Sequence, residues 1–279
     1  MRVTVEELGP KNSEALRTVL ARDISHNLYL LGVLEDLGIT PKPDAPRFAF
    51  WGALRAGELK AALFVDLDRG WVVPSASDSS DIAAIAQHLG GTLRARACLG
   101  DALAVEPIVR FLFPGKPRTR IEQRLFAATA DDLGPFTNPA LRLATEADLP
   151  RVLPLAAACV RETLGRDPLA GDPDGYPIRV LERIRRQRTW ILEEDDRIVF
   201  KIDVGSRCRY GVELEAPYTL PYDRGRGHAT LSLGQLSRQL LSSLSKVTLR
   251  VDQNNGSFAA VVRKVGYVPG RPQRLVMAD

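Results

Sequence analysis

The alternation of apolar and polar residues predicts strands and helices in a regular order through the second half of the chain. Residues 190–192 and 198–204 alternate as the two arms of a hairpin, and residues 212–220 alternate as a further strand. The leucines beyond it recur at helical spacing, at Leu231, Leu233, Leu236, Leu240 and Leu241. We therefore expect a strand to lead into a helix across residues 221–229.

The second half begins with a short strand and two helical regions. Residues 141–144 form a plausible strand, and Thr145 followed by Asp148 resembles a capping box that opens a helix toward Cys159. Residues 161–188 would supply the second helical region.

The first half opens in the same way. Residues 3–5 read as a strand, a helix is expected from about Asn12, and residues 48–54 and 59–65 pair as a hairpin. The chain has 279 residues and is 45% hydrophobic, which is enough for two ordinary domains with proper cores. The proline-rich stretch 134–139 is the expected seam, giving domains 1–136 and 137–279.

The segment Arg224-Gly225-Arg226-Gly227-His228-Ala229 carries the most specific chemistry. Gly225 and Gly227 lack a Cβ, so the backbone can turn sharply and bring its N–H groups close to a bulky anion. Together with the positive end of the following helix, these donors suit a diphosphate-bearing cofactor. The dinucleotide fingerprint and the nucleoside triphosphate loop are both incomplete here. A basic surface turn before a helix is the alternative.

The loop and the segments after it resemble the GNAT acetyltransferase superfamily. The loop fits the family pattern Arg/Gln-x-x-Gly-x-Gly/Ala, and residues 247–255 look like the strand and asparagine that follow it. Asn255 lies eleven residues before Gly266, which matches the family's spacing. The resemblance runs from about Asn138 to the C-terminus and implies the order β, α, α, β, β, β, α, β, α.

The resemblance implies an α/β fold with a mixed (α+β) sheet and two tandem GNAT-like domains. The half 1–136 looks like a diverged duplicate without the glycine loop, similar to a bacterial subgroup that pairs a degenerate N-terminal half with an active C-terminal half. Cofactor binding is therefore assigned only to the second half.

The resemblance further implies an N-acetyltransferase that moves an acetyl group from acetyl-CoA to an amine by direct attack in a ternary complex. Its cofactor-binding residues would be Tyr218, Thr219, Arg224, Gly225, Arg226, Gly227, His228, Ala229 and Asn255. For His228, packing or helix capping is the alternative to any chemical role.

Glu213 and Glu215 are the candidates for the catalytic base. They are two residues apart on one strand and so share one face of the sheet. Glu213 lies eight residues before Pro221, where many family members carry the glutamate that deprotonates the amine. A solvated strand face is the alternative for both.

Two positions depart from the family. Val262 occupies the position of the tyrosine that protonates the leaving thiolate, and Tyr222, Tyr218 or Cys208 could substitute for it. Pro217 has no N–H and lies near the strand bulge where a backbone N–H commonly polarises the acetyl carbonyl. A catalytically impaired acyl-CoA-binding or sensing protein is therefore the alternative function.

Charge and composition constrain partners only weakly. The net charge is +4, and five arginines crowd one helical region, at Arg179, Arg183, Arg185, Arg186 and Arg188. A solvated helix face explains them better than a nucleic-acid site, which is the third hypothesis. Three cysteines without C-x-x-C spacing and the isolated His26 and His88 favour neither disulfides nor a metal.

The expected partner is a small-molecule or protein amine, with Arg161, Asp167 and Tyr176 as candidate acceptor contacts. No signal sequence or 18-residue apolar run is found, so a cytoplasmic protein without a membrane partner is expected. A monomer and a homodimer both remain open.

Overall fold

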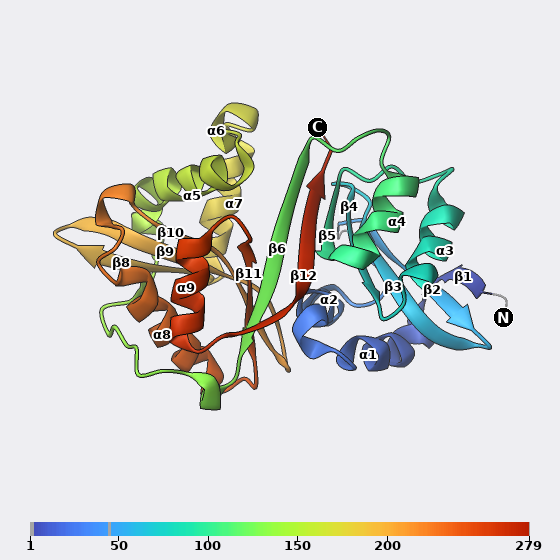
Figure 1. Cartoon of the computed structure of the whole chain (residues 1–279). Helices are drawn as coiled ribbons and strands as arrows, with labels where there is room; N and C mark the ends of the chain where they lie inside the picture. Colours follow the sequence, from blue (N-terminus) through green and yellow to red (C-terminus); the bar gives the residue numbers. More distant parts are fainter. Residues whose placement is uncertain (1–2, 44–45, 279) are drawn as a thin grey trace. The chain divides into compact units, whose positions relative to one another are not determined.

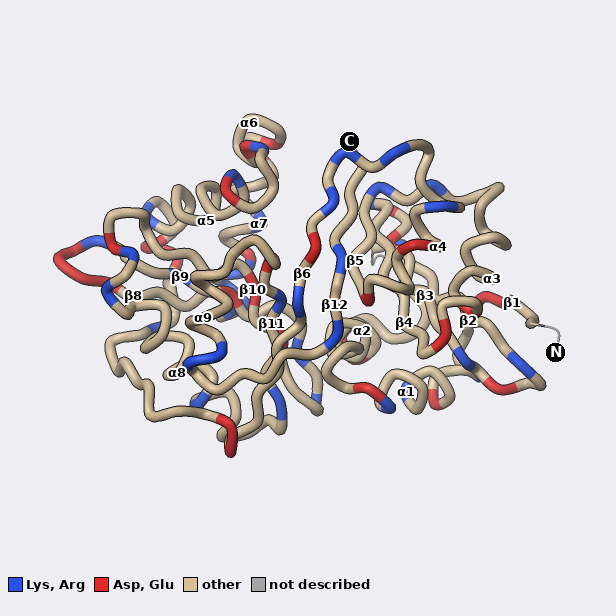
Figure 2. Tube along the Cα trace, in the orientation of Figure 1, with Lys and Arg blue, Asp and Glu red and all other residues tan. Residues whose placement is uncertain are grey.

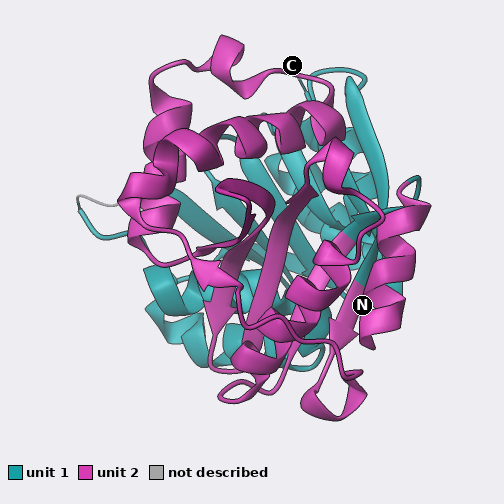
Figure 3. Ribbon diagram, turned by 90° about the vertical axis from the view of Figure 1, so that its left-hand side faces the viewer, with its two compact units in different colours: residues 1–125, 251–254, 270–279 teal, residues 126–250, 255–269 magenta. Residues whose placement is uncertain are grey.

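A computed structural model describes residues 3–43 and 46–278 (Figure 1). The chain divides into two compact units, shown in two colours in Figure 3. Unit 1 consists of residues 1–125, 251–254 and 270–279, and unit 2 of residues 126–250 and 255–269. The division into domains 1–136 and 137–279 stays a prediction, and it does not include the two returns of the chain into unit 1.

Unit 1 is built on a mixed sheet in the order β1-β2-β3-β4-β5-β12. Its strands are β1 (Val3–Glu7), β2 (Phe48–Arg55), β3 (Glu58–Asp66), β4 (Trp71–Ala76), β5 (Ala97–Asp101) and β12 (Val268–Met277, of which residues 270–277 belong to this unit). Its helices are α1 (Ser13–Ala21), α2 (Ile24–Leu37), α3 (Ser79–Leu89) and α4 (Ala102–Leu112).

The expected hairpin of unit 1 is confirmed as β2 and β3. Its two-residue turn, Ala56-Gly57, has positive φ at both positions, which is the twist that joins adjacent antiparallel strands most directly. The apolar faces of α3 and α4 bury Ile82 and Ile108 in one core cluster with strand residues such as Leu63 and Val276. Val276 comes from β12, so the end of the chain contributes to the core of unit 1.

Unit 2 repeats this arrangement with the strand order β7-β8-β9-β10-β11. Its strands are β7 (Arg142–Leu143), β8 (Thr189–Glu194), β9 (Arg197–Cys208), β10 (Gly211–Thr219) and β11 (Val247–Asp252, of which residues 247–250 belong to this unit). Its helices are α5 (Leu149–Leu164), α6 (Pro168–Gly171), α7 (Gly175–Arg185), α8 (His228–Leu241) and α9 (Gly256–Val265). The strand β6 (Thr119–Ala128) runs from unit 1 into unit 2.

Local sequence signals in unit 2 are confirmed. β8 and β9 pair antiparallel across Asp195-Asp196, both with positive φ. The Thr145–Asp148 capping box forms as expected, because the Asp148 carboxylate accepts the Thr145 backbone N–H at 2.9 Å. It opens a short 3-10 turn that continues into α5.

The fold class is confirmed as mixed α/β. In each unit one pair of strands is parallel, β4 with β5 and β10 with β11, whereas the neighbouring pairs are antiparallel. Among the described residues, no helix combines the length and the apolar character needed to cross a membrane.

Candidate functional site

The two parallel strands of unit 2 pair only at their beginnings. β10 and β11 are in register at Val212↔Val247, Glu213↔Thr248 and Leu214↔Leu249, and the register ends there. β10 continues along β9 as far as Thr219, with a bulge between Glu215 and Tyr218. Within the bulge Ala216 has a φ of +49°, and Pro217 offers no N–H for a ladder. The irregular backbone at Ala216 and Pro217 therefore lies where the sequence predicts a bulge in the strand.

The glycine loop leads from β10 into α8 and leaves the helix start open. Gly225 (φ +79°) and Gly227 (φ +90°) use the left-handed conformation that favours glycine. A Cβ added to either glycine would meet no atom within 4 Å. Gly227 is the N-cap of α8, and no side chain caps the helix. The first N–H groups of α8 thus face an open approach, which suits a phosphate group.

The two loop arginines are held differently. The Arg224 guanidinium makes two 2.8 Å bonds to the Glu162 carboxylate on α5, and its Nε donates to the Thr219 carbonyl at 3.1 Å. It also lies over the Tyr218 ring, so Arg224 fastens the loop to α5 and β10. Arg226 pairs with Asp223 at 3.2 Å and keeps a 61% exposed side chain. Of the two loop arginines, Arg226 is therefore the one whose charge is more exposed to solvent.

Two buried polar residues flank the loop at Asp223 and His228. Asp223 is 2% exposed and His228 is 7% exposed. The His228 Nδ1 lies 3.2 Å from Glu194 Oε1, at the end of β8, where the acidic β8–β9 turn forms a red loop in Figure 2. Within the described residues, Asp223 Oδ2 and His228 Nε2 have no hydrogen-bond partner. The role of His228 stays a prediction, with a buried ring held beside Glu194.

Glu213 lies deep in unit 2 beside Arg250 of β11. Its carboxylate Oε1 accepts a hydrogen bond from the Arg250 guanidinium, and both side chains are 8% exposed. Burial raises the pKa of Glu213, and Arg250 offsets part of that rise. Glu213 Oε2 and Thr248 Oγ1 have no partner in the described chain. The solvated-face alternative is therefore wrong for Glu213.

Glu215 is partly exposed and belongs to a network that sequence reasoning missed. Arg183 of α7 donates to Glu215 at 2.9 Å and to Asp203 at 3.0 Å. Asp203 also accepts from Lys201 Nζ at 2.8 Å and from Thr189 at 3.0 Å. Lys201 is 1% exposed, and its Nζ also donates to the Ala216 carbonyl inside the bulge at 3.2 Å. In the sequence, the only indication of this network was the alternation of polar and apolar residues across 200–204.

The candidate acids lie in different surroundings. Tyr222 is 90% exposed, and Cys208 is buried at 4%. Tyr218 is 7% exposed, follows the bulge and donates its hydroxyl hydrogen to Glu162 at 3.3 Å. Val262 is fully buried in α9. Of the three substitutes, Tyr218 alone is both at the bulge and able to donate a proton.

Asn255 and the expected acceptor contacts are placed as follows. The Asn255 side chain caps α9 by accepting the Phe258 N–H at 3.1 Å, which leaves its amide N–H₂ able to donate. Arg161 and Asp167 pair at 3.1 Å on the surface. Tyr176 lies half-buried under Arg179, and burial raises its pKa to about 12.

The arginines of the α7 region are mostly occupied within the chain. Arg179 pairs with Asp172, Arg183 with Asp203 and Glu215, and Arg185 with Glu146. The Arg188 guanidinium donates to the Gly205 carbonyl at 3.0 Å. This pairing removes most of the charge that a nucleic-acid surface would need.

The fold and the site together define a class of protein. Each of its two units has one pair of parallel strands that separate after a short paired stretch, and unit 2 has in addition an open glycine loop at the start of a helix. No protein-family model matches the sequence, and no curated protein matches it. Solved structures do match over the whole chain. An acetyltransferase of the GNAT family from Colwellia psychrerythraea is 12% identical with a TM-score of 0.60, covering 100% of both chains.

Two further structures match in the same way. A tandem GNAT protein from the clavulanic acid biosynthesis pathway is 11% identical, with a TM-score of 0.58 over 99% of this chain and 98% of that one. A GCN5-related N-acetyltransferase from Sphaerobacter thermophilus is 15% identical, with a TM-score of 0.55 over 98% and 94%. The chain therefore has the GNAT acetyltransferase fold in tandem, and the resemblance carried by the loop is confirmed at the level of the fold.

Proposed function

We propose that unit 2 is an N-acetyltransferase that takes its acetyl group from acetyl-CoA and transfers it to an amine. The observation that carries the proposal is the start of α8, which Gly227 leaves uncapped and open beside the end of β10–β11 pairing. The N–H groups of residues 228–230 and the Arg226 charge suit a pyrophosphate. The Asn255 amide is available to the pantetheine arm, and bound acetyl-CoA would supply the activated thioester.

Glu213 is the proposed base. A buried carboxylate with a raised pKa holds a proton more readily than an exposed one, which brings it closer to the range useful for accepting a proton near neutral pH. Its Oε2 has no partner among the described residues, so that oxygen is available to the amine directly or through water. Glu215 is the second choice, because Arg183 already binds its carboxylate.

The bulge in β10 supplies the remaining groups. Pro217 cannot donate, so the backbone N–H groups on either side of it, at Ala216 and Tyr218, are the candidates to stabilise a developing oxyanion. The Tyr218 hydroxyl is the proposed proton donor to the leaving thiolate, ahead of Tyr222, which is 90% exposed.

An acyl-CoA-binding protein without turnover is the second candidate. Two observations favour it: Val262 fills the position of the family's acid and is fully buried, and Glu213 is already paired with Arg250. Both candidates require CoA binding, and turnover alone separates them.

The test is a calorimetric titration with acetyl-CoA of the wild type and of Gly227→Trp. We expect micromolar binding by the wild type and its loss in the variant, because an indole would cover the open start of α8. Gly57→Trp is the matched control, since Gly57 also has positive φ (+81°) and open space but lies in unit 1. Absence of binding by the wild type would overturn both candidates. If the wild type binds acetyl-CoA, release of free thiol in the presence of amines decides for the enzyme.

A further inference from the structure

Unit 1 contains a hollow at the place where its own parallel strands separate. β4 and β5 pair only at Trp71↔Ala97 and Val72↔Cys98, after which β4 stays with β3, and β5 with β12. The hollow has a volume of about 80 Å³, and all of its lining residues belong to unit 1. At roughly 10–15 Å³ per water molecule, it can hold several waters or a small ligand group.

The two acids of the hollow are both paired with one arginine. Arg271 binds Asp23 at 2.8 Å and Asp101 at 2.7 Å, and its backbone N–H donates to His26 Nε2 at 3.1 Å. Since Nε2 accepts, the proton of a neutral His26 is on Nδ1, which donates to Asp23 at 2.9 Å. The His26 hydrogen bond, aided by Arg271, lowers the pKa of Asp23 to about 2. These four residues form one hydrogen-bonded wall, which carries two negative charges and one positive charge when His26 is neutral.

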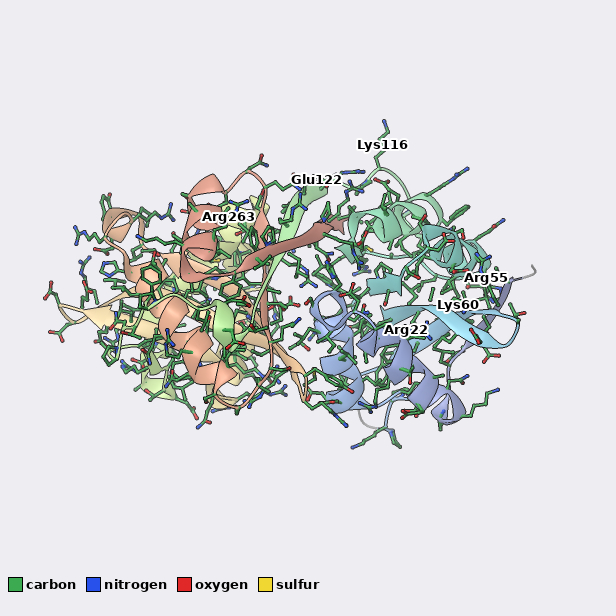
Figure 4. The ribbon with its side chains drawn as sticks, turned by 60° about the horizontal axis from the view of Figure 1, so that its bottom comes forward. Arg22, Arg55, Lys60, Lys116, Glu122 and Arg263 are labelled. Atoms are coloured by element: carbon green, nitrogen blue, oxygen red, sulfur yellow. The ribbon has the colours of Figure 1, made fainter. Side chains whose placement is uncertain are left out.

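Beside this wall the hollow is lined by possible donors at Arg22, Lys60 and Ser75, and by Asn27, whose amide N–H₂ already donates to the Leu20 carbonyl at 2.9 Å. Arg22 and Lys60 both line it and lie in the same part of unit 1 (Figure 4). The Arg22 guanidinium makes no ion pair with any described residue, and the partner of Lys60 is Glu58, whose side chain is 72% exposed. The hydrogen bond from Lys60, with a weaker contribution from the Arg22 charge, lowers the pKa of Glu58. Ser75 also lines the hollow and is 6% exposed.

A nucleotide cofactor does not fit unit 1 in the way it fits unit 2. The helix after β4 is α3, and its N-cap is Asp78, whose carboxylate accepts the Ser80 N–H at 2.8 Å. Asp81 adds a second carboxylate to the first turn. The Asp78 carboxylate uses an N–H donor of the helix start, and its negative charge disfavours the kind of anion that the open start of α8 would accept. In unit 1 the hollow is therefore a better place for an anion than the start of α3.

We propose that this hollow binds a compact oxyanion, the phosphate or carboxylate group of a small molecule. The Arg22 guanidinium offers a planar fork of donors, the Lys60 ammonium a mobile charge and the Ser75 hydroxyl a buried donor. Charge-assisted hydrogen bonds to a phosphate or a carboxylate satisfy all three, and no acid of the wall is left unpaired to oppose them. The site is separate from the proposed acetyl-CoA site and does not depend on it.

The test uses the full chain carrying Gly227→Trp, so that anions do not bind at the start of α8. Inorganic phosphate and malonate are titrated separately at constant ionic strength, by calorimetry and by the shift in melting temperature. We expect saturable binding of at least one anion below about 10 mM, and the stronger of the two identifies phosphate or carboxylate as the group recognised.

The variants decide whether the hollow is the site. Arg22→Gln combined with Lys60→Gln should weaken binding at least tenfold, and Ser75→Ala, which removes the hydroxyl and adds no atom, should weaken it separately. Lys116→Gln is the control, because Lys116 is an exposed cation of the same unit that does not line the hollow. Binding that is undiminished in the double variant would overturn the proposal. So would the absence of saturable binding of both anions to a parent protein that melts cooperatively.

Discussion

Glu213 combines deep burial, one bound oxygen and one free oxygen. Arg250 holds Oε1, so the side chain has a fixed orientation, whereas Oε2 is left without a partner in the described structure. Leaving one buried carboxylate oxygen unsatisfied costs stability, and such a cost is commonly retained where it serves chemistry. This residue is therefore the most direct point at which to test catalysis.

Glu213→Gln should reduce turnover by about 10²–10⁴-fold and leave acetyl-CoA affinity nearly unchanged. Because burial raises the pKa of Glu213, the wild-type rate should fall on the acid side at a pH above the ordinary glutamate value of about 4.3. That acid limb should disappear in the variant. A pH series of thiol release measures both effects. Glu215→Gln is the matched control, and full activity in Glu213→Gln would transfer the role of base to Glu215 or to water.

Lys201 is the second residue whose burial demands an explanation. It joins Asp203 to the carbonyl of Ala216 and so connects the charged network to the bulge of β10. Lys201→Met should cost roughly 3 kcal/mol in unfolding free energy, because Asp203 loses a buried partner. Urea unfolding measures the loss. Adding Asp203→Asn should restore part of the stability, since no carboxylate charge is then left with too few partners. Lys246→Met, at a partly exposed lysine of the same unit, should change stability by less than about 0.5 kcal/mol.

At the scale of elements, both parallel pairs stop shortly before a proline in the strand. Pairing of β4 with β5 ends at Val72, two residues before Pro74, and pairing of β10 with β11 ends at Leu214, three residues before Pro217. Proline lacks the N–H of a ladder and is confined to edges and bulges of sheets. Pro74 and Pro217 therefore help to explain why the parallel strands separate, at the hollow in unit 1 and at the candidate site in unit 2.

The start of α5 offers an element-level prediction. Asp148 accepts hydrogen bonds from Thr145 at the start of the turn, binds Arg142 at 2.8 Å and is only 2% exposed. These hydrogen bonds, chiefly the one from Arg142, hold the pKa of Asp148 well below the usual range. The carboxylate therefore stabilises the fold above the unfolded pKa of about 3.9, and this stability is lost as the pH falls through the depressed folded value.

Asp148→Ala should cost about 1–2 kcal/mol at neutral pH and progressively less in acid. Glu146→Ala is the matched control on the same turn, because the ion pair of Glu146 with Arg185 is more than half exposed and should contribute little. Thermal unfolding at several pH values measures both variants. An equal loss in the two would contradict the role assigned to the buried cap.

The elements that could be predicted were those with local causes. The hairpins β2–β3 and β8–β9, the capping box and the glycine loop each depend on a few adjacent residues, and each is confirmed. No element was expected across residues 71–112, where Pro74 lies inside β4 and Pro107 inside α4. The Lys201–Asp203 network also escaped prediction, because alternating charges on a strand indicate solvent unless partners from α7 are known.

At the scale of the whole molecule, β12 is the feature that departs furthest from two consecutive domains. Its residues from Gly270 onward belong to unit 1, where they pair antiparallel with β5 from Gln273↔Asp101 to Met277↔Ala97. Such pairing depends on residues more than 170 positions apart, and no local pattern reveals it.

Val276→Asp should loosen unit 1 although it lies near the end of the chain. Val276 is fully buried in the core cluster of unit 1, and an unpaired carboxylate there would be strongly destabilising. Amide hydrogen exchange should increase in β4 and β5 and remain slow in β8 and β9. Val268→Asp is the control, at a 57% exposed position of the same strand. Exchange that increases in unit 2 alone would contradict the assignment of β12 to unit 1.

The position of β12 in the sequence also determines when the sheet of unit 1 can be completed during translation. When β5 leaves the ribosome at Asp101, its partner strand begins roughly 170 residues later, which at about 5–20 residues per second means a delay of about 8–35 s. During that interval the edge of β5 has exposed N–H and C=O groups that can pair with another nascent chain. The first unit to emerge is thus the last to be closed, and its yield in the cell should depend on whatever protects that edge while translation finishes.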